Sequence, residues 1–244
     1  RLWHSRRRNT RDGSRRNIAA HYDLGNEFFA LFLDSSLMYS SAIYVDADDS
    51  LEQAQQRRLH RICQKLDLKP GERLVEIGTG WGGFAIHAAQ HYGVHVTTTT
   101  ISRRQHELAA QRIQAAGLNE RVTLLLDDYR DLRGQYDKLV SIEMIEAIGH
   151  QYLDTYFRKV SDLLKDDGLA LIQAITIEDH RYERALGDID FIKRYIFPGS
   201  FIPSVGAMTG AIARSSNLRL THLEDIGPSY ARTLRAWHDR FLAA

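Results

Sequence analysis

A short stretch that changes abruptly from apolar residues to glycines is the first candidate binding site in this sequence. Residues 75–83 read VEIGTGWGG, so the apolar run ends at Ile77 and four glycines follow within six positions. Gly78 and Gly80 can adopt positive φ or let a ligand lie against the backbone, and the amino end of the following helix is a positive pole. Glu76, ahead of the first glycine, suits a ligand that carries a positive charge. A tight structural turn is the alternative interpretation.

Two common phosphate-binding patterns do not fit this loop. Its spacing, Gly-x-Gly-x-Gly-Gly, lacks the full dinucleotide pattern, because Trp81 occupies the turn and Gly82 and Gly83 are adjacent. No Gly-Lys-Ser/Thr follows, so a P-loop is excluded. The loop alone therefore does not identify its ligand.

Three other residues with chemical potential have structural interpretations. His87 and His91 stand four residues apart in a helical pattern, a spacing that a metal pair can use. No third ligand is evident in the sequence, so solvent-facing histidines are favoured and no metal is expected. Cys63, the single cysteine, excludes an internal disulfide and falls in a helical pattern, which predicts a small core residue.

Strands and helices alternate through most of the chain. Hydrophobic periodicity predicts helices at 50–66, 82–92, 103–116 and 150–164, and strands at 73–77, 94–100, 121–126, 137–142 and 169–177. Such alternation implies right-handed crossovers and a mainly parallel sheet covered on both faces, so we predict a doubly wound α/β fold. In such sheets a ligand binds beyond the carboxyl ends of the strands, where the strand order reverses.

The alternation ends after residue 178. Residues 180–216 read as helical pieces around Phe197-Pro198-Gly199, and a last pair of strands is predicted near 217–227. This break is typical of an insertion over the sheet.

Composition and charge bound the class of protein. A chain of 244 residues with 43% hydrophobic and 26% charged residues is expected to be globular, with a sizeable core. No apolar run of about 18 residues is present, and no apolar segment follows the first arginines, so neither a membrane helix nor a signal peptide is expected and a cytosolic location is predicted. The net charge of +1 hides a basic start, where one acid, Asp12, stands among Arg1, Arg6, Arg7, Arg8, Arg11, Arg15 and Arg16.

Six stretches give the sequence a specific resemblance. They are HYDLGNEFFALFLDSSLMYSSA (21–42), LKPGERLVEIGTGWGGFAIHAA (68–89), TISRRQ (100–105), DDYRDL (127–132), SIEMIEAIGHQY (141–152) and YIFPGSFIPS (195–204). Through them the chain resembles the cyclopropane-fatty-acyl-phospholipid synthase family, S-adenosylmethionine-dependent enzymes with the class I methyltransferase fold. The resemblance implies a mainly parallel seven-stranded sheet. It also implies a basic segment with lid helices over 1–49, and a methyltransferase domain over 50–244 with a helical insertion over the active site at about 178–216.

The resemblance implies an S-adenosylmethionine site at the glycine loop. Family members bind this cofactor through the loop backbone and through a lid that carries Tyr39 and Ser40. The second strand ends without the acid that generic methyltransferases place on the ribose, and Gln105 takes that role in the family. Asp128 is expected to accept from the adenine amine and Tyr129 to pack on the adenine, with an ordinary surface ring as the alternative for Tyr129. The implied cofactor-binding set is Tyr39, Ser40, Gly78, Gly80, Thr100, Ile101, Gln105, Asp128, Tyr129 and Ile142.

The resemblance also implies a base that is not a side chain. An alkene that attacks a sulfonium methyl becomes a carbocation, which must lose a proton to close a cyclopropane ring or leave a methylene product. The family uses bound bicarbonate for this step. The residues implied to hold it are Ser41, Glu146, Gln173, Ile175 through its backbone, and Tyr230, and we expect these five to converge on one small pocket.

Two of these positions depart from the usual pattern of the family. Ser41 replaces a cysteine, a mild change because its hydroxyl and N–H can still contact an anion. Gln173 replaces a histidine, and an amide can donate to bicarbonate but cannot carry charge or shuttle a proton. Methyl transfer is therefore expected, while ring closure and a methylene branch both remain open.

Glu146 and the insertion have structural alternatives. Glu146 follows the fourth predicted strand, where a carboxylate could simply cap the helix that begins near Gly149. The apolar residues Tyr195, Ile196, Phe197, Phe201 and Ile202 could pack a core, but the resemblance favours the wall of an acyl tunnel.

Three classes of function are compatible with these observations. The first is C-methylation of unsaturated acyl chains of phospholipids, by a cytoplasmic enzyme at the inner face of the membrane that could form a homodimer. The second is N-methylation of a soluble amine, since plant alkaloid N-methyltransferases share much of the pattern. The third, nucleic-acid binding through the basic start, is disfavoured because no stacking aromatics accompany the arginines, and contact with anionic lipid explains them as well.

Overall fold

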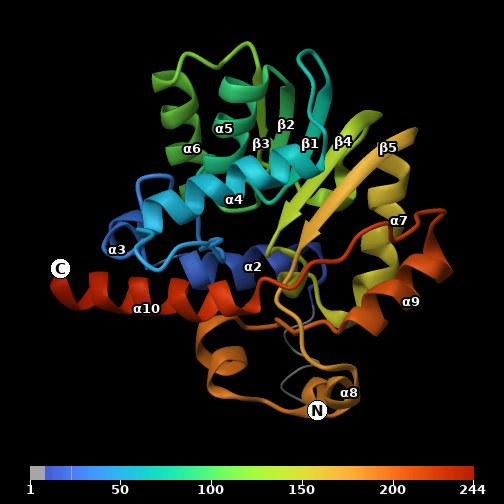
Figure 1. Ribbon diagram of the computed structural model, residues 1–244. Helices are drawn as coiled ribbons and strands as arrows, with labels where there is room; N and C mark the ends of the chain where they lie inside the picture. The colour runs from blue at the N-terminus through green and yellow to red at the C-terminus, as the bar shows by residue number, and fades with distance from the viewer. Residues whose placement is uncertain (1–8, 23) are drawn as a thin grey trace.

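Five parallel strands form the centre of the molecule (Figure 1). The computed structural model describes residues 9–22 and 24–244. The strands lie in the order β3-β2-β1-β4-β5. Their bounds are Arg73–Ile77 (β1), His95–Thr99 (β2), Val122–Leu125 (β3), Tyr136–Ile142 (β4) and Leu164–Gln173 (β5).

Helices cover both faces of this sheet because its strands alternate their apolar side chains between two cores. Leu74 of β1 belongs to the core beneath α4, α5 and α6, while its neighbour Val75 belongs to the core beneath α7 and α9. The helix bounds are Leu51–Lys65 (α4), Gly83–Tyr92 (α5), Arg103–Ala115 (α6), Leu153–Leu163 (α7) and Val205–Ser215 (α9). The predicted doubly wound α/β fold is confirmed.

The strand order reverses between β1 and β4. From β1 the chain continues outward to β2 and β3, then crosses back so that β4 pairs with the other side of β1. The carboxyl ends of β1 and β4, at Ile77 and Ile142, are therefore the switch point at which doubly wound proteins bind ligands.

A third group of helices lies beyond the carboxyl ends of the strands. In Figure 1 the arrowheads of β4 and β5 point toward the level of α2 and α10. Side chains of α10 hold the segment before α4, because Thr233 and Ser229 accept hydrogen bonds from the N–H groups of Ala42 and Tyr44 at 3.1 Å each. The elements of this layer are α2 (Arg11–Tyr22), α3 (Asn26–Ala30), α8 (Asp179–Gly187), η4 (Ile192–Ile196) and α10 (Gly227–Ala243).

Local sequence signals set several of these boundaries. Ser50 and Gln53 form a reciprocal capping box at the start of α4. Gly93, with φ of 66°, ends α5 in the left-handed region. Such signals explain why most predicted bounds lie within three residues of the observed ones.

The strand count is the main correction. The described residues form five strands, not seven, and residues 217–227 form none. Strands were predicted there, but Leu220 and Leu223 are exposed. Glu224 instead forms ion pairs with Arg61 and Lys65 of α4. Such side-chain pairs hold the segment without the backbone ladder that a strand requires.

The last strand also begins earlier than expected. β5 starts at Leu164 and ends at Gln173, whereas 169–177 was predicted. A register irregularity explains the start, because Tyr136 pairs with Leu164 while Lys138 already pairs with Leu169. Residues 165–168 therefore lie opposite Asp137 alone.

Three further expectations from the sequence have mixed outcomes. Cys63 is a buried core residue, as predicted. The interpretation of His87 as solvent-facing is wrong, because it is buried and its ring centroid lies 4.6 Å from that of His91. Of the basic start, Arg1, Arg6, Arg7 and Arg8 lie outside the described residues.

Candidate functional site

The glycine loop leaves β1 at the switch point. Gly78 has φ of 101°, and a Cβ there would lie 3.0 Å from Cγ of Met144 in the loop after β4. Gly80 has φ of 54° with no atom within 4 Å of an added Cβ, so its backbone borders open space. The loop is anchored by N–H groups of Gly78 and Thr79, which donate to the Thr99 carbonyl at 3.1 and 3.0 Å.

A buried carboxylate and a buried guanidinium lie beneath this loop. Glu76 accepts a hydrogen bond from the Thr98 hydroxyl at 2.6 Å, and burial raises the pKa of Glu76 to about 8. Arg58 of α4 is fully buried, and burial lowers its pKa to about 10 although the charge of Glu143 opposes that shift. Nη1 and Nη2 of Arg58 have no hydrogen-bond partner within the described part of the chain.

Gln105 is positioned by the end of β2. Its amide oxygen accepts from the Thr100 hydroxyl at 2.8 Å, and its backbone N–H donates to Ser102, the N-cap of α6, at 3.3 Å. Ile101 is half-buried between these two residues. The structure therefore groups Thr100, Ile101 and Gln105 on the β2 side of the glycine loop.

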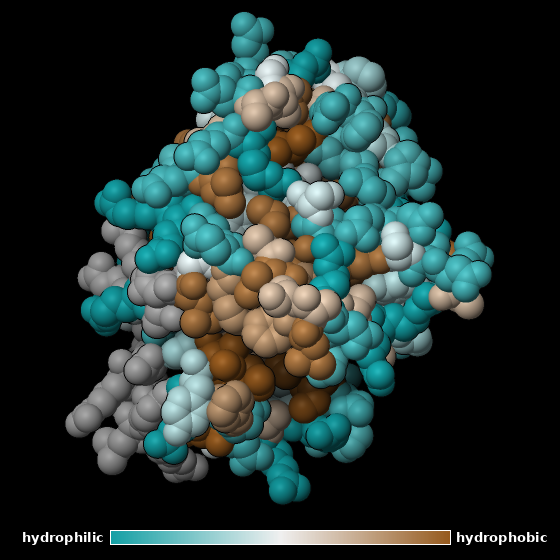
Figure 2. Space-filling model, turned by 90° about the vertical axis from the view of Figure 1, so that its left-hand side faces the viewer, coloured by the Kyte–Doolittle hydropathy of each residue, from teal (hydrophilic) through white to brown (hydrophobic). Residues whose placement is uncertain are grey.

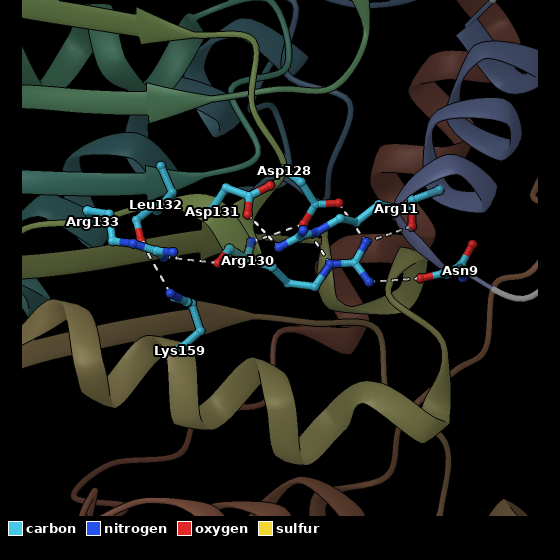
Figure 3. A network of polar contacts seen from close by, with 9 residues as sticks. Asn9, Arg11, Asp128, Arg130, Asp131, Leu132, Arg133 and Lys159 are labelled. Carbon is cyan, nitrogen blue, oxygen red and sulfur yellow. Dashed lines mark hydrogen bonds and ion pairs between the residues drawn. The ribbon is translucent and has the colours of Figure 1, made fainter.

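Asp128 forms an ion pair with a residue of its own loop. Both of its carboxylate oxygens accept from the Arg130 guanidinium, at 2.7 and 2.6 Å (Figure 3). Burial alone would raise the pKa of Asp128, but these hydrogen bonds outweigh it and the pKa is lowered. Arg130 also donates to the Asn9 carbonyl at 3.1 Å, so the pair ties the segment before α2 to this edge of the site.

Tyr129 is not a surface ring. It packs against Tyr156 at 5.7 Å between centroids, and burial raises the pKa of its hydroxyl. Its alternative interpretation as an exposed residue is therefore wrong.

Tyr39, the neighbour of Ser40, lies in an aromatic cluster. It contacts Trp237 of α10 at 5.3 Å between ring centroids and stacks on Phe197, which follows η4, at 6.4 Å. The Ser40 carbonyl accepts from the Gln55 amide at 3.0 Å. The buried Ser40 hydroxyl has no partner among residues 9–22 and 24–244, so it is available to a ligand.

Ser41 and Gln173 meet at a carboxylate that the sequence did not single out. Glu143, the first residue after β4, accepts from the Ser41 N–H at 2.9 Å and from the Gln173 amide at 2.8 Å, both on Oε1. The Gln173 amide also donates to the Ser41 carbonyl at 3.3 Å. Burial raises the pKa of Glu143, against the opposing effect of these donors and of Arg58.

Glu146 lies one short helical turn further on. Its Oε1 accepts from the Ile175 N–H at 2.6 Å, so it does not cap the helix near Gly149. Burial, reinforced by the neighbouring Glu143, raises the pKa of Glu146 to about 8. Its Oε2 is buried and has no partner in the described ranges, which is the situation of a group that awaits a ligand or carries a proton.

Tyr230 closes the cluster from α10. Burial and the charges of Glu143 and Glu146 raise the pKa of Tyr230 to about 12. Hydrogen bonds thus link Ser41 and Gln173 to Glu143, and Ile175 to Glu146, just after Ile142, the last residue of β4.

Glu143 and Arg58 are the residues that sequence reasoning missed. Glu143 stands in the stretch SIEMIEAIGHQY, directly after the strand that forms half of the switch point, and that position was an available signal. Arg58 is on a helix face that its pattern marks as buried, where a charged residue requires an explanation.

The reversing parallel sheet, with a glycine loop after its first strand, defines the class I methyltransferase fold. The chain belongs to the mycolic acid cyclopropane synthetase family, whose match covers residues 9–244. The resemblance found in the sequence is thereby confirmed.

Individual relatives and solved structures agree with this assignment. Cyclopropane-fatty-acyl-phospholipid synthase of Escherichia coli K12 is 44% identical over 227 residues, which are 92% of this chain and 56% of that protein. Tuberculostearic acid methyltransferase UfaA1 of Mycobacterium tuberculosis is 42% identical over 240 residues, 96% of this chain and 56% of that protein. The chain therefore spans about half the length of these relatives. Mycolic acid cyclopropane synthase CmaA1, complexed with SAH and CTAB, has a TM-score of 0.87 at 31% identity, covering 94% of this chain and 83% of that chain.

Proposed function

We propose that this chain is the methyltransferase core of an enzyme that uses S-adenosylmethionine to C-methylate unsaturated acyl chains of phospholipids. The observation that carries the proposal is the buried carboxylate cluster at the end of β4, in contact with the glycine loop through Met144. A lone pair on an amine substrate would make such a cluster unnecessary for methyl transfer, whereas an alkene leaves a cation that must lose a proton. The names of the relatives from E. coli and M. tuberculosis support a lipid substrate.

The residues present fit the cofactor. Gly80 offers backbone bordered by open space, and the buried hydroxyl of Ser40 needs a partner. Gln105 and Thr100 would contact the ribose side, and Tyr129 the adenine side. When bound, the cofactor would supply an electrophilic methyl group on a cationic sulfur. A positive sulfur close by would favour the ionised forms of Glu76 and Glu143, whose pKa values burial raises.

Asp128 would contact the adenine while it stays hydrogen-bonded to Arg130. Since Arg130 already takes both Asp128 oxygens, we expect Asp128 to accept from the adenine amine only with an oxygen that is shared with Arg130.

Apolar residues beside the site and on the nearby surface support an acyl substrate. Tyr39 and Phe197 bring the lid and the insertion into contact, and Phe201 donates its N–H to the Glu146 carbonyl at 3.0 Å. Figure 2 shows a broad apolar area on the side of the molecule where α3 and the end of α10 lie. From these two helices Leu31, Phe241 and Leu242 are exposed.

This apolar area supports docking at a membrane surface. No helix in the described ranges is both long and apolar enough to cross a bilayer. We propose peripheral contact, in which the arginines of the basic start, of which Arg11 and Arg16 are described, add attraction to anionic lipid.

The predicted role of bicarbonate as the base stays a prediction. Two of its implied donors, the Ser41 N–H and the Gln173 amide, already donate to Glu143. The carboxylate cluster therefore offers two sources of a base, a captured anion or a side chain.

Transfer of isotope-labelled methyl groups tests the proposed function. The protein is incubated with labelled S-adenosylmethionine and, separately, with unsaturated phospholipid vesicles, saturated vesicles, soluble amines and RNA. Label in the acyl chains of the unsaturated vesicles alone is the expected result, with mass spectrometry showing a gain of one CH2 per modified chain. Fragmentation then distinguishes a ring from a branch. Label in the amines instead would replace the proposal with N-methylation.

A further inference from the structure

Glu143 has an unusual backbone conformation for its residue type. Its φ of 45° lies in the left-handed region, which glycine adopts freely and other residues rarely adopt. A strained position of this kind is energetically unfavourable and is typical of functional sites. The turn after β4 would be satisfied by glycine, so the side chain at this position needs a reason of its own.

The contacts of Glu143 supply that reason. Its Oε1 takes the Ser41 N–H and the Gln173 amide, two of the donors that a bicarbonate ion would use. Its Oε2 accepts no hydrogen bond from the part of the chain that the structure describes, and the residue is only half-buried. One carboxylate oxygen is thus fixed and the other is free to face a substrate.

A second anion in this position would be strongly disfavoured. A bicarbonate ion held by Ser41 and Gln173 would lie beside Glu143, and like charges a few ångström apart in a buried site raise each other's energy. Glu146 adds a further carboxyl group to the same cluster.

The surroundings of the two carboxyl groups favour different protonation states. Burial raises the pKa of Glu143, but the two hydrogen bonds that it accepts and the charge of Arg58 oppose this shift and favour its ionised form. Burial raises the pKa of Glu146, and the neighbouring Glu143 charge reinforces this shift against the hydrogen bond from Ile175. Paired carboxyl groups whose environments differ in this way commonly divide into a base and an acid.

We propose that the Glu143 carboxylate is the chain's own proton acceptor and takes the place that bicarbonate has in the related synthases. The proposal rests on the proposed function. The alkene π pair forms the new bond to the methyl carbon while sulfur takes the pair of the broken C–S bond, which leaves a cation on the other alkene carbon. Glu143 then removes a proton from the new methyl group, and the released C–H pair closes the ring. If a hydride first shifts to the cationic carbon, the same proton loss gives a methylene branch. In both cases Glu143 ends as the neutral acid.

Gln173 fits this assignment better than a histidine would. A neutral amide donor fixes the carboxylate without taking its proton, whereas an imidazole beside Glu143 could be protonated and would form an ion pair that lowers its basicity. Gln173, which departs from the family pattern, therefore serves to orient the Glu143 carboxylate.

Removal of dissolved carbon dioxide gives the first test. Wild-type protein is assayed for label transfer to unsaturated vesicles in degassed buffer, with and without added bicarbonate. Equal activity in both buffers is expected. Activity that depends on bicarbonate would overturn the proposal while leaving the proposed function intact. No label in lipid under either condition would overturn the proposed function and this proposal with it.

A glycine substitution gives the second test. Glu143→Gly removes the carboxylate and also relieves the positive φ, so the fold is expected to tolerate it. We expect product formation to fall by a factor on the order of 100, with partial rescue by added formate or bicarbonate in the space left by the side chain. Cofactor affinity, measured by calorimetry, should stay within a few-fold of the wild type.

Two further variants keep this result interpretable. Asp67→Gly is the matched control, because Asp67 is also an acid at positive φ, 49°, and is exposed and remote from the site. It should leave product formation unchanged. Glu143→Gln keeps an oxygen for both donors but removes the basic group, and it should be as slow as Glu143→Gly without rescue. Full activity of Glu143→Gln would overturn the proposal.

Discussion

The carboxyl ends of β1 and β4 are neighbours at the switch point. At both ends the next residue has a positive φ, but the two residues serve different purposes. The first residue after β1 is Gly78, with φ of 101°, and the first residue after β4 is Glu143, with φ of 45°. At β1 the positive φ comes with no side chain, so the backbone is open to a ligand. At β4 the same region of φ carries a carboxylate that reaches Ser41 and Gln173. The β1 side of the switch point therefore leaves open space in which a ligand can bind. The β4 side instead presents a carboxylate side chain from a residue with a strained backbone conformation.

The largest expected effect comes from filling the β1 side. Gly80→Val should abolish cofactor binding, lowering affinity by a factor on the order of 100 or more, because a branched side chain would occupy the open space at the loop. Calorimetry with S-adenosylmethionine measures this loss.

Gly71→Val is the control for backbone strain. Gly71 also has positive φ, 84°, and open space around an added Cβ, but it lies before β1 and away from the switch point. It should lose stability to a similar extent and keep its cofactor affinity. Equal loss of binding in both variants would mean that the glycine loop acts through folding alone.

Glu146, on the β4 side, should make the stability of the folded protein depend on pH. The pKa of Glu146 is about 8 in the fold and 4.5 for the free side chain, so the folded state holds a proton that the unfolded chain has lost between these values. Stability should therefore fall as the pH rises from about 5 to about 8. Glu146→Gln removes this proton equilibrium, and we expect its melting temperature to exceed that of the wild type by roughly 5 °C at pH 9.

This advantage should shrink toward pH 5, where Glu146 is neutral in both states. Glu52→Gln is a suitable control, because Glu52 is exposed and its pKa is lowered by its hydrogen bond to Arg240. If the melting temperatures of Glu146→Gln and the wild type change with pH in parallel, Glu146 is ionised in the fold.

A smaller effect is expected at the adenine edge, outside the switch point itself. Arg130→Ala frees both Asp128 oxygens and releases the Asn9 carbonyl, so the edge loses its rigid support (Figure 3). Cofactor affinity should fall by about tenfold. Arg133→Ala, which removes only hydrogen bonds to the carbonyls of Arg130 and Leu132, should leave it nearly unchanged. Equal affinities of the two variants would exclude a supporting role for Arg130.

The β1 and β4 sides also differ in how far the sequence predicts them. The β1 side follows local rules, since an apolar run, a glycine loop and a capped helix can each be recognised within a few residues, and β1 was predicted at its observed bounds. The α/β alternation and the resemblance also gave the fold and the grouping of Ser41, Glu146, Gln173 and Ile175.

The β4 side depends on contacts that no local rule contains. Glu143 was missed because its partners come from residues 102 and 30 positions away, and its positive φ is invisible in the sequence. The Arg130 contact of Asp128 was missed because two charged residues two positions apart in a loop rarely signal a bidentate pair. The strands near 217–227 were predicted from alternation alone, which cannot show whether a neighbouring strand is available.

The most direct test of the division between the two carboxyl groups is a carbon-13 NMR titration of side-chain-labelled glutamate. Spectra of Glu143→Gln and Glu146→Gln assign the two signals. We predict that the Glu146 carboxyl is protonated at pH 7 and titrates with a midpoint near pH 8, while Glu143, which accepts two hydrogen bonds where Glu146 accepts one, loses its proton first. If Glu146 instead ionises first and Glu143 is the group that keeps its proton at pH 7, Glu143 is not the base and this account of the site is wrong.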